Sequence, residues 1–426
     1  MLKITGCNKV KGTVIPDSDK SISHRAVMLS ALAQGQSKVS NLLLSKDIYA
    51  TIDCFSQLGT RFELDGTTLA IYPTPLRQPS KVLYASNSGT TARLLAGILA
   101  GQDFDVTLTG DESLKKRPMG RIITPLQLMG AEISARKGDY CPLQIKGNRL
   151  AGITYRQEVS SAQQKSAILL AGLYAQGATT VIEKAKSRNH TEIMLKEMGA
   201  SVNTVGNSIS IEAGKLVAKD WQVPGDISTA AFYLALGAIC EGAQVTVKNV
   251  GLNPTRTGII EVLQKMGVII TVTYTQSYGE PYGDITVQGS ALKGIEISGE
   301  IIPRLIDELP IISVCAAFAK GRTIIKDAGE LRVKESNRIA CMVEQLRQGG
   351  INAYELADGL VIEGGKAIGG EFSSYGDHRI AMSMIVFALC ASGQSTITGE
   401  DCIDISAPNF ISSLQTLVPN GAIYLA

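Results

Sequence analysis

The sequence predicts an α/β protein built from six similar units, each running helix, strand, helix, strand, strand. Two recurring patterns carry this prediction. In the first, an Ala- and Leu-rich helical run ends in glycine and is followed by a β-type run. In the second, a shorter helix ends in glycine directly before an apolar strand. The two patterns alternate along the chain, which indicates strands joined by crossover helices.

The first pattern occurs six times. Its helical runs are AVMLSALAQG, TARLLAGILAG, SAILLAGLYAQG, AAFYLALGAICEG, PIISVCAAFAKG and AMSMIVFALCASG. They end at glycines 35, 101, 177, 242, 321 and 393. We expect each of these glycines to stop its helix in the left-handed conformation, which glycine adopts without steric cost.

The second pattern also occurs six times, in the segments QLG-TRFEL, LMG-AEISA, EMG-ASVNT, KMG-VIITV, QGG-INAYE and PNG-AIYLA. Its glycines are 59, 130, 199, 267, 350 and 421, and they mostly recur about every 70 residues, as repeats do. In several units a hairpin should follow, with Asp65-Gly66 and Asp358-Gly359 as its turn.

The last unit is incomplete, because the sequence stops after one strand, AIYLA. We expect the N-terminal strand Leu2–Thr5 to supply the missing partner. The units then divide three and three into two domains, residues 1–18 with 227–426 and residues 19–226. The chain would cross between them near residues 13–19 and 224–230, with Val223-Pro224-Gly225-Asp226 as a hinge. A chain of 426 residues is also too long for one ordinary core.

Composition indicates a soluble globular protein, with 45% apolar residues, 19% charged residues and a net charge of +2. Neither this charge nor the 5% of aromatic residues suggests nucleic-acid binding. The eight cysteines are scattered without C-x-x-C, which favours reduced thiols in the cytoplasm. The N-terminal MLKITGCNKVKG has no apolar signal core, and the uncharged run Ile380–Ala391 is too short for a membrane span.

Polar clusters begin all six Ala-rich helices. They are KSISHR (20–25), NSGTTAR (87–93), SSAQQK (160–165), GDIST (225–229), IDELP (306–310) and GDHR (376–379). Helix capping accounts for their Ser, Thr, Asn and Asp residues, but not for Lys20, Arg25, Arg93 or Arg379. Cations beside the free N–H groups of a helix start favour bound anions.

The second helix class begins with further cations, in KKRPMGR (115–121), KSRNH (186–190) and RVKESNR (332–338). The three histidines, His24, His190 and His378, all lie in these clusters. A structural role is the commoner one for a histidine, but this placement hints at function. The sequence has no HExxH, paired Cys/His, Walker A or G-x-G-x-x-G motif, so we expect no metal and no nucleotide cofactor.

The surplus of Arg and Lys suits a small substrate with phosphate and carboxylate groups. Carboxylates lie among these cations, in Asp307-Glu308 and at Glu335. Glu335 could form an i,i+3 ion pair with Arg338, which is worth little when exposed, or it could transfer protons. The residues predict an enzyme for small polyanions and do not define its reaction.

The ordered motifs resemble one family over essentially the whole chain. They are DKSISHRA, NSGTTARLL, GDESLKKRPMGR, SSAQQKSAILLAGL, SRNHTEIML, VPGDISTAAF, IDELP, ELRVKESNRI and GDHRIAM. These motifs identify the sequence as similar to the 5-enolpyruvylshikimate-3-phosphate (EPSP) synthases. The resemblance implies the two-domain enolpyruvyl transferase fold, with three β-α-β-α-β-β repeats per domain (an inside-out α/β barrel) and the active site in the cleft between the domains.

The resemblance also implies the reaction, which transfers the enolpyruvyl group of phosphoenolpyruvate to the 5-hydroxyl of shikimate 3-phosphate and releases phosphate. No cofactor, nucleic acid or membrane takes part, and we expect a monomer. By motif, the ligands of shikimate 3-phosphate would be Lys20, Ser21, Arg25, Ser161, Gln163, Ser187, Arg188, Asp307 and Lys334. The ligands of phosphoenolpyruvate would be Lys20, Gly89, Arg117, Gln163, Arg338 and Arg379. The proton-transfer groups would be Asp307 as base, and Glu335 with Lys20 or Lys334, beside His378.

The sequence departs from the family pattern at two places, where it reads Asp17-Ser18 before Asp19 and where Ile405 replaces a lysine. His24 places it in the branch that has H-R in the first motif. Gly89 leaves room for glyphosate, so we expect at least partial sensitivity to this inhibitor. Two alternatives remain, the related transferase for UDP-N-acetylglucosamine and a repeat-built anion-binding protein. The former needs a reactive cysteine beside a Gly-rich loop, and the latter has no use for Asp307 and Glu335.

Overall fold

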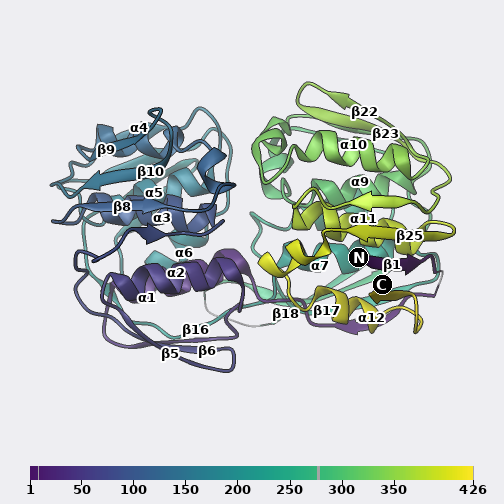
Figure 1. Cartoon of the computed structure of the whole chain (residues 1–426), viewed down its shortest axis with the longest axis horizontal. Helices are drawn as coiled ribbons and strands as arrows, with labels where there is room; N and C mark the ends of the chain where they lie inside the picture. Colours follow the sequence, from purple (N-terminus) through teal and green to yellow (C-terminus); the bar gives the residue numbers. More distant parts are fainter. Residues whose placement is uncertain (8, 276–278, 426) are drawn as a thin grey trace. The chain divides into compact units, whose positions relative to one another are not determined.

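The computed structural model describes residues 1–7, 9–275 and 279–425. It divides into two compact units (Figure 1). The N-terminal unit is Ser18–Val223, and the C-terminal unit combines Met1–Asp17 with Pro224–Ala426. Both units use one repeat, which is simplest to follow in the middle of the N-terminal unit.

There, β7 (Leu83–Tyr84) lies parallel to β8 (Val106–Thr109), and the hairpin β9 (Glu132–Arg136) and β10 (Tyr140–Lys146) completes the order β7-β8-β10-β9. Helix α3 (Gly89–Ala100) connects the parallel strands, and α4 (Gly120–Leu128) leads to the hairpin. The repeat is therefore β-α-β-α-β-β. The leading strand, which the unit patterns omit, is only two residues long and carries no periodicity that a sequence could reveal.

The other two sheets of the N-terminal unit have the same order. The first consists of β16 (Trp221–Gln222), β4 (Ser37–Ser40), β6 (Thr68–Tyr72) and β5 (Arg61–Asp65). The second consists of β11 (Thr154–Arg156), β12 (Thr179–Ile182), β14 (Ser208–Ile211) and β13 (Val202–Val205). A short parallel pair joins β3 (Ala33–Gln34) to β15 (Leu216–Val217). The helices are α1 (Lys20–Leu32), α2 (Lys46–Gln57), α5 (Ala162–Gly172), α6 (His190–Glu197) and the 3-10 turn η1 (Leu114–Lys116).

The C-terminal unit repeats the order with strands from both ends of the chain. Its first sheet consists of β2 (Lys11–Val14), β17 (Gln244–Gly251), β19 (Tyr282–Gln288) and β18 (Ile269–Thr275). The second consists of β20 (Glu296–Ile297), β21 (Arg322–Ile325), β23 (Gly359–Glu363) and β22 (Asn352–Leu356). The third consists of β24 (Glu371–Ser373), β25 (Gln394–Thr398), β1 (Leu2–Thr5) and β26 (Ile423–Leu425). In the last sheet β1 is antiparallel to both β25 and β26, so the first strand of the chain closes the sixth repeat.

The helices of this unit are α7 (Ile227–Ile239), α8 (Gly258–Lys265), α9 (Leu309–Ala317), α10 (Arg338–Gln348), α11 (His378–Cys390) and α12 (Phe410–Gln415), with 3-10 turns η2 (Gly299–Arg304), η3 (Gly329–Val333) and η4 (Glu400–Ile405). None of the helices in the described ranges is long and apolar enough to cross a bilayer.

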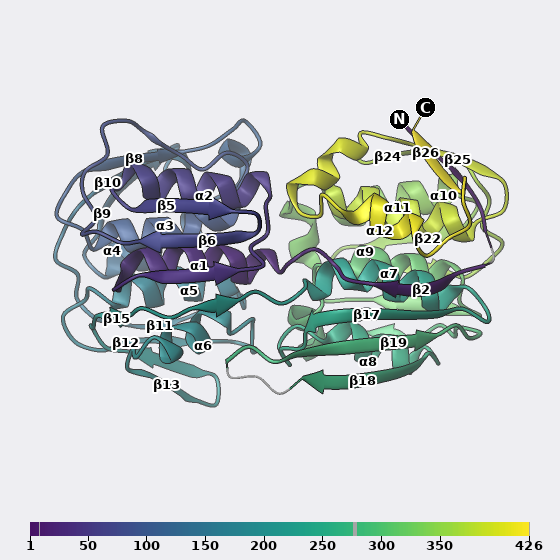
Figure 2. The same ribbon diagram turned by 90° about the horizontal axis from the view of Figure 1, so that it is seen from below.

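The Ala-rich helices lie inside each unit and the strands lie outside (Figure 2). Helices α1, α3 and α5 are buried on nearly every side, whereas β10 alternates buried and exposed side chains. Small residues permit the close helix contacts. A Cβ at Gly97 of α3 would overlap the carbonyl oxygen of Ala167 in α5. Ala and Gly therefore recur in these helices because neighbouring backbones occupy the space of a larger side chain.

The glycines that end the helices behave differently in the two patterns. Gly59, Gly130, Gly199, Gly267 and Gly350 each follow the C-cap residue with positive φ, as a left-handed helix stop requires. In the first pattern the expectation is wrong for Gly101, which is itself the C-cap at φ −95°. The other first-pattern glycines have positive φ but lie in the turn beyond the helix end.

The segment around Asp17 is fixed within the C-terminal unit. Asp17 accepts a hydrogen bond from Asn409 Nδ2 (2.7 Å), and its carbonyl oxygen accepts one from Asp226 N (2.8 Å). A Cβ at Gly225 would lie 2.6 Å from Pro16 Cγ, so this glycine permits the close approach. Burial raises the pKa of Asp17, although hydrogen bonds from Asn409 oppose the shift. The Asp17 departure thus has a packing role at the start of α12.

Candidate functional site: two clusters at helix starts

The first cluster begins at α1 of the N-terminal unit. The N-cap Asp19 accepts a hydrogen bond from Ile22 N at 2.8 Å, which fixes the first turn of the helix. Lys20 follows it and forms an ion pair with Asp47 of α2 at 3.1 Å. Its side chain keeps 18% exposure, so the ammonium group remains within reach of a ligand while Asp47 orients it.

Arg25, one turn further along α1, is held by two other helices. Its Nε donates to Thr191 Oγ1 (2.7 Å), and one Nη donates to Ser166 Oγ (3.0 Å). The other Nη donates to the carbonyl oxygen of Ser21 (3.0 Å). The guanidinium is buried and planar, so these contacts set its orientation.

Gln163 connects the starts of α5 and α3. Its side-chain oxygen accepts from Arg93 (2.9 Å), and its side-chain nitrogen donates to Thr90 Oγ1 (3.2 Å). Ser161 is the N-cap of α5 and accepts from Gln164 N at 3.4 Å. Gln163 therefore ties the first turn of α5 to the first turns of α3.

Gly89 begins α3 between two arginines. A Cβ at this position would lie 2.7 Å from a terminal nitrogen of Arg93 and 3.3 Å from one of Arg117. Arg117 follows the 3-10 turn η1 and donates to Asn87 Oδ1 at 2.7 Å. The missing side chain of Gly89 lets both guanidinium groups approach the helix start.

Ser187 lies in the loop before α6, which also contains Arg188. Ser187 is buried, and both its backbone N–H and its hydroxyl donate to Glu183. Glu183 in turn pairs with Lys165 of α5 at 3.0 Å. Glu183 and Lys165 thus attach the loop to the interior of the N-terminal unit.

In the C-terminal unit the second cluster surrounds Arg338, the first residue of α10. Its guanidinium contacts Asp377 (2.8 Å), Glu335 (2.7 Å) and Asp307 (3.2 Å). Arg338 is 1% exposed. Burial opposes its ionisation, but the three carboxylates outweigh burial and raise the pKa of Arg338 above its ordinary value. Burial also opposes ionisation of Asp377, which by itself would raise the pKa of this carboxyl group. The charge of Arg338 outweighs burial, so the pKa of Asp377 is lowered.

Asp307 lies between two cations. Besides Arg338, Lys334 Nζ approaches Asp307 Oδ1 at 3.6 Å, and Arg379 donates to the carbonyl oxygen of Asp307 at 3.2 Å. Glu335 keeps 27% exposure while it pairs with Arg338. The i,i+3 ion pair of Glu335 with Arg338 is therefore formed, with the arginine buried and the carboxylate accessible from solvent.

All three histidines are buried. His24 Nδ1 lies 2.7 Å from Thr51 Oγ1; burial, with help from Lys20 and Arg25, lowers the pKa of His24 well below its ordinary value. The imidazole of His24 is therefore neutral at pH 7. His378 Nε2 lies 3.2 Å from Oγ of Ser406, the residue that follows Ile405 in the sequence.

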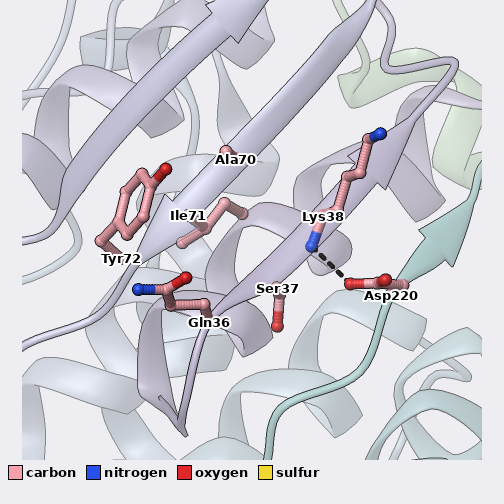
Figure 3. A pocket seen from close by; sticks show the side chains of 7 residues that line it. All are labelled: Gln36, Ser37, Lys38, Ala70, Ile71, Tyr72 and Asp220. Carbon is pink, nitrogen blue, oxygen red and sulfur yellow. Dashed lines mark hydrogen bonds between the residues drawn. The ribbon is translucent and has the colours of Figure 1, made fainter.

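No group of three or more His, Cys, Asp or Glu side chains in the described ranges is arranged to hold a metal ion. A separate hollow of about 210 Å³ lies on β4 and β6, lined by residues 36–38, 70–72 and Asp220 (Figure 3). Lys38 N donates to Asp220 Oδ1 across its edge at 2.7 Å. None of the predicted site residues lines this hollow.

The structure therefore arranges the predicted residues in two sets. The N-terminal unit contains Lys20, Ser21, Arg25, Gly89, Arg117, Ser161, Gln163, Ser187 and Arg188, and the C-terminal unit contains Asp307, Lys334, Glu335, Arg338, His378 and Arg379. The sequence reasoning missed the carboxylates that hold the cations, Asp47, Glu183 and Asp377. Asp377 lay inside the GDHR cluster and could have been noticed there, whereas Asp47 and Glu183 lie outside every motif.

The structure consists of six β-α-β-α-β-β repeats in two units, with cations and carboxylates at their helix starts, which is the architecture of the enolpyruvyl transferase fold. This fold class is confirmed by a solved structure, that of the EPSP synthase of Acinetobacter baumannii. The two sequences are 43% identical and the two structures superpose with a TM-score of 0.89. The match covers 100% of this chain and 99% of the Acinetobacter chain. The model of the EPSP synthase (3-phosphoshikimate 1-carboxyvinyltransferase) family matches residues 4–414. The chain belongs to this family.

Two further relatives carry the name 3-phosphoshikimate 1-carboxyvinyltransferase. The protein of Alkaliphilus metalliredigens is 50% identical over 424 residues, which cover 98% of this chain and 100% of that protein. The protein of Bacillus cytotoxicus is 49% identical over 415 residues, which cover 96% and 98%. The similarity therefore extends through both units.

Proposed function

We propose that the protein transfers the enolpyruvyl group of phosphoenolpyruvate to the 5-hydroxyl of shikimate 3-phosphate and releases inorganic phosphate. Membership in the family and the names of its relatives support this reaction. The observation that carries the chemistry is Asp307, a carboxylate between Lys334 and Arg338 with Glu335 on the same guanidinium. Such a cluster holds a base and an acid together at a site for anions.

The roles are assigned by the family motifs. Shikimate 3-phosphate would be bound by Lys20, Ser21, Arg25, Ser161, Gln163, Ser187, Arg188, Asp307 and Lys334, and phosphoenolpyruvate by Lys20, Gly89, Arg117, Gln163, Arg338 and Arg379. The guanidinium of Arg338 donates to three carboxylates. We propose that phosphoenolpyruvate displaces Glu335 or Asp307 from it, which would free a carboxylate for proton transfer.

In the first step Asp307 would accept the proton of the 5-hydroxyl as its oxygen attacks C2 of phosphoenolpyruvate. The methylene carbon would gain a proton from Glu335, assisted by Lys20 or Lys334 and beside His378, to give a tetrahedral adduct with a methyl group. In the second step the methyl group would return one proton to Glu335 and the C–O bond to phosphate would break, so that phosphate leaves with the bonding electrons and takes up the proton held by Asp307. This restores the enol double bond and balances the reaction without an external oxidant or reductant.

Phosphate release tests the reaction. With shikimate 3-phosphate and phosphoenolpyruvate together, the protein should release phosphate at a rate typical of enzymes, and neither substrate alone should support release. UDP-N-acetylglucosamine in place of shikimate 3-phosphate should give none. Burial raises the pKa of Cys141 to about 11, so that thiol is a poor nucleophile. Release only with the nucleotide sugar, or none at all, would reject the proposal in favour of the two alternatives.

We also propose that the clusters of both domains act on one pair of substrates, in a cleft between residues 1–18 with 227–426 and residues 19–226. For each substrate, some of the assigned residues belong to the N-terminal unit and the others to the C-terminal unit. Small-angle scattering should show a smaller radius of gyration with both ligands than without, and its forward intensity should give the mass of a monomer. An unchanged radius would contradict closure, and a doubled mass would contradict the monomer. We place the reaction in the cytoplasm.

A further inference from the structure

A buried ion triad lies behind the loop that contains Ser187. Lys165 of α5 is 1% exposed and forms ion pairs with Glu183 at 3.0 Å and with Glu192 at 2.6 Å. Glu183 directly follows β12 and Glu192 lies in the first turn of α6. One ammonium group therefore joins three elements of the N-terminal unit at a point without solvent.

The triad is next to the residues that orient Arg25. Lys165 and Ser166 are neighbours on α5, and Thr191 and Glu192 are neighbours on α6. Ser166 Oγ lies 2.7 Å from Thr191 Oγ1, and both hold Arg25. Two successive residue pairs thus connect α5 to α6, one neutral and one charged.

Glu183 uses its two oxygens for different tasks. Oε2 pairs with Lys165, while Oε1 accepts the backbone N–H of Ser187 at 3.0 Å and also its hydroxyl. A carboxylate can accept all three donors at once because it has no hydrogen of its own. An amide in its place cannot, since its NH₂ group would face either the ammonium group or the backbone N–H.

We propose that Glu183 is a positioning residue for the phosphate group of shikimate 3-phosphate, acting through Ser187, with Lys165 fixing the carboxylate in place. The proposal rests on the proposed function, which assigns Ser187 to that substrate. Glu183 holds the backbone of Ser187 while the serine hydroxyl turns from Oε1 to the phosphate oxygen. Lys165 keeps the carboxylate charge compensated when the hydroxyl leaves, which lowers the cost of the exchange.

The test compares two matched variants, Glu183→Gln and Glu192→Gln. Each removes one carboxylate from Lys165 and leaves it paired with the other, but of these two carboxylates Glu183 is the one that accepts hydrogen bonds from Ser187. Calorimetric titration with shikimate 3-phosphate should show binding weakened about 10- to 100-fold in Glu183→Gln, because a buried donor loses its acceptor. Glu192→Gln should bind within about threefold of the unchanged protein.

A second measurement separates positioning from a general loss of structure. Glu183→Gln should raise KM for shikimate 3-phosphate, while KM for phosphoenolpyruvate and kcat at saturation stay within about twofold. It should also reduce the preference for shikimate 3-phosphate over shikimate, which lacks the phosphate. In a Ser187→Ala background the Glu183→Gln change should have a smaller effect, because the two act as one unit.

The triple variant Lys165→Met, Glu183→Gln, Glu192→Gln covers the case in which Glu183→Gln alone does not fold. It makes the whole triad neutral, which buried ion groups commonly tolerate, and it should show the same loss of shikimate 3-phosphate binding. Equal weakening in both single variants, or unchanged binding in Glu183→Gln or in the triple variant, would overturn the proposal. If the unchanged protein itself releases no phosphate from the two substrates, the proposed function fails instead.

Discussion

Replacing Asp307 with alanine should lower kcat by about 10² to 10⁴-fold, the range that a positioned general base supplies. Both substrates should still bind, because Arg338 keeps Asp377 and Glu335 as partners and the other cations are untouched. Asp307→Asn should show the same loss, since the amide keeps the shape of the side chain but cannot accept the proton of the hydroxyl. Steady-state phosphate release gives kcat, and calorimetric titration gives the affinities.

The control for Asp307 is Glu296→Gln. Glu296 belongs to the same unit and pairs with Lys326 at 2.8 Å, but both side chains are about half exposed. Removal of such a surface carboxylate has little effect on stability or chemistry, so the rate should remain within about twofold. A near-normal rate in both Asp307 variants would exclude Asp307 as the base and leave Glu335 as the candidate.

Arg338→Met should produce the largest loss of stability. The change leaves Asp377, Asp307 and Glu335 without the guanidinium, and Asp377 is fully buried. Removal of one partner from a buried ion pair costs about 3–5 kcal/mol, because the remaining charge stays uncompensated. Scanning calorimetry should therefore show the transition of the C-terminal unit several degrees lower, whereas the N-terminal unit should keep its own transition.

Two variants sharpen this second prediction. Arg322→Met removes an arginine that pairs with Glu363 while its own side chain is 61% exposed, and it should change stability by about 0.5 kcal/mol or less. Arg338→Met combined with Asp377→Asn should recover part of the lost stability, since the deepest uncompensated charge is then gone. An Arg338→Met protein that unfolds at the temperature of the unchanged protein would show that the cluster is better solvated than the structure indicates.

The repeats were readable from the sequence because they depend on local patterns. Helix runs of small apolar residues, glycines at C′ positions and polar N-caps such as Asp19, Ser161 and Asp377 each act within one or two turns of chain. The family and its reaction were likewise identified from ordered motifs. The two-residue strands, such as β7 and β16, escaped because two residues cannot display a period.

The motifs located the cations and catalytic carboxylates along the sequence but did not identify all the groups that hold them. Lys20 meets Asp47 at a separation of 27 residues, Arg338 meets Asp377 at 39, and Arg25 meets Thr191 at 166. Sheet register and helix packing, which no local pattern encodes, bring these partners together. Ordinary carboxylates outside any motif, such as Glu183, therefore acquire their importance from tertiary structure.

The sequence by itself determined the six repeats, the cationic helix starts, and the presence of Asp307 and Glu335 among cations. Local propensity and motif order suffice for these features, since each involves residues close together in the chain. Only the tertiary structure decided which carboxylate fixes which cation, and that Lys165, Glu183 and Ser187 form one buried unit. Such pairings depend on exclusion of water, which gives charges their strength and arises only when distant segments pack.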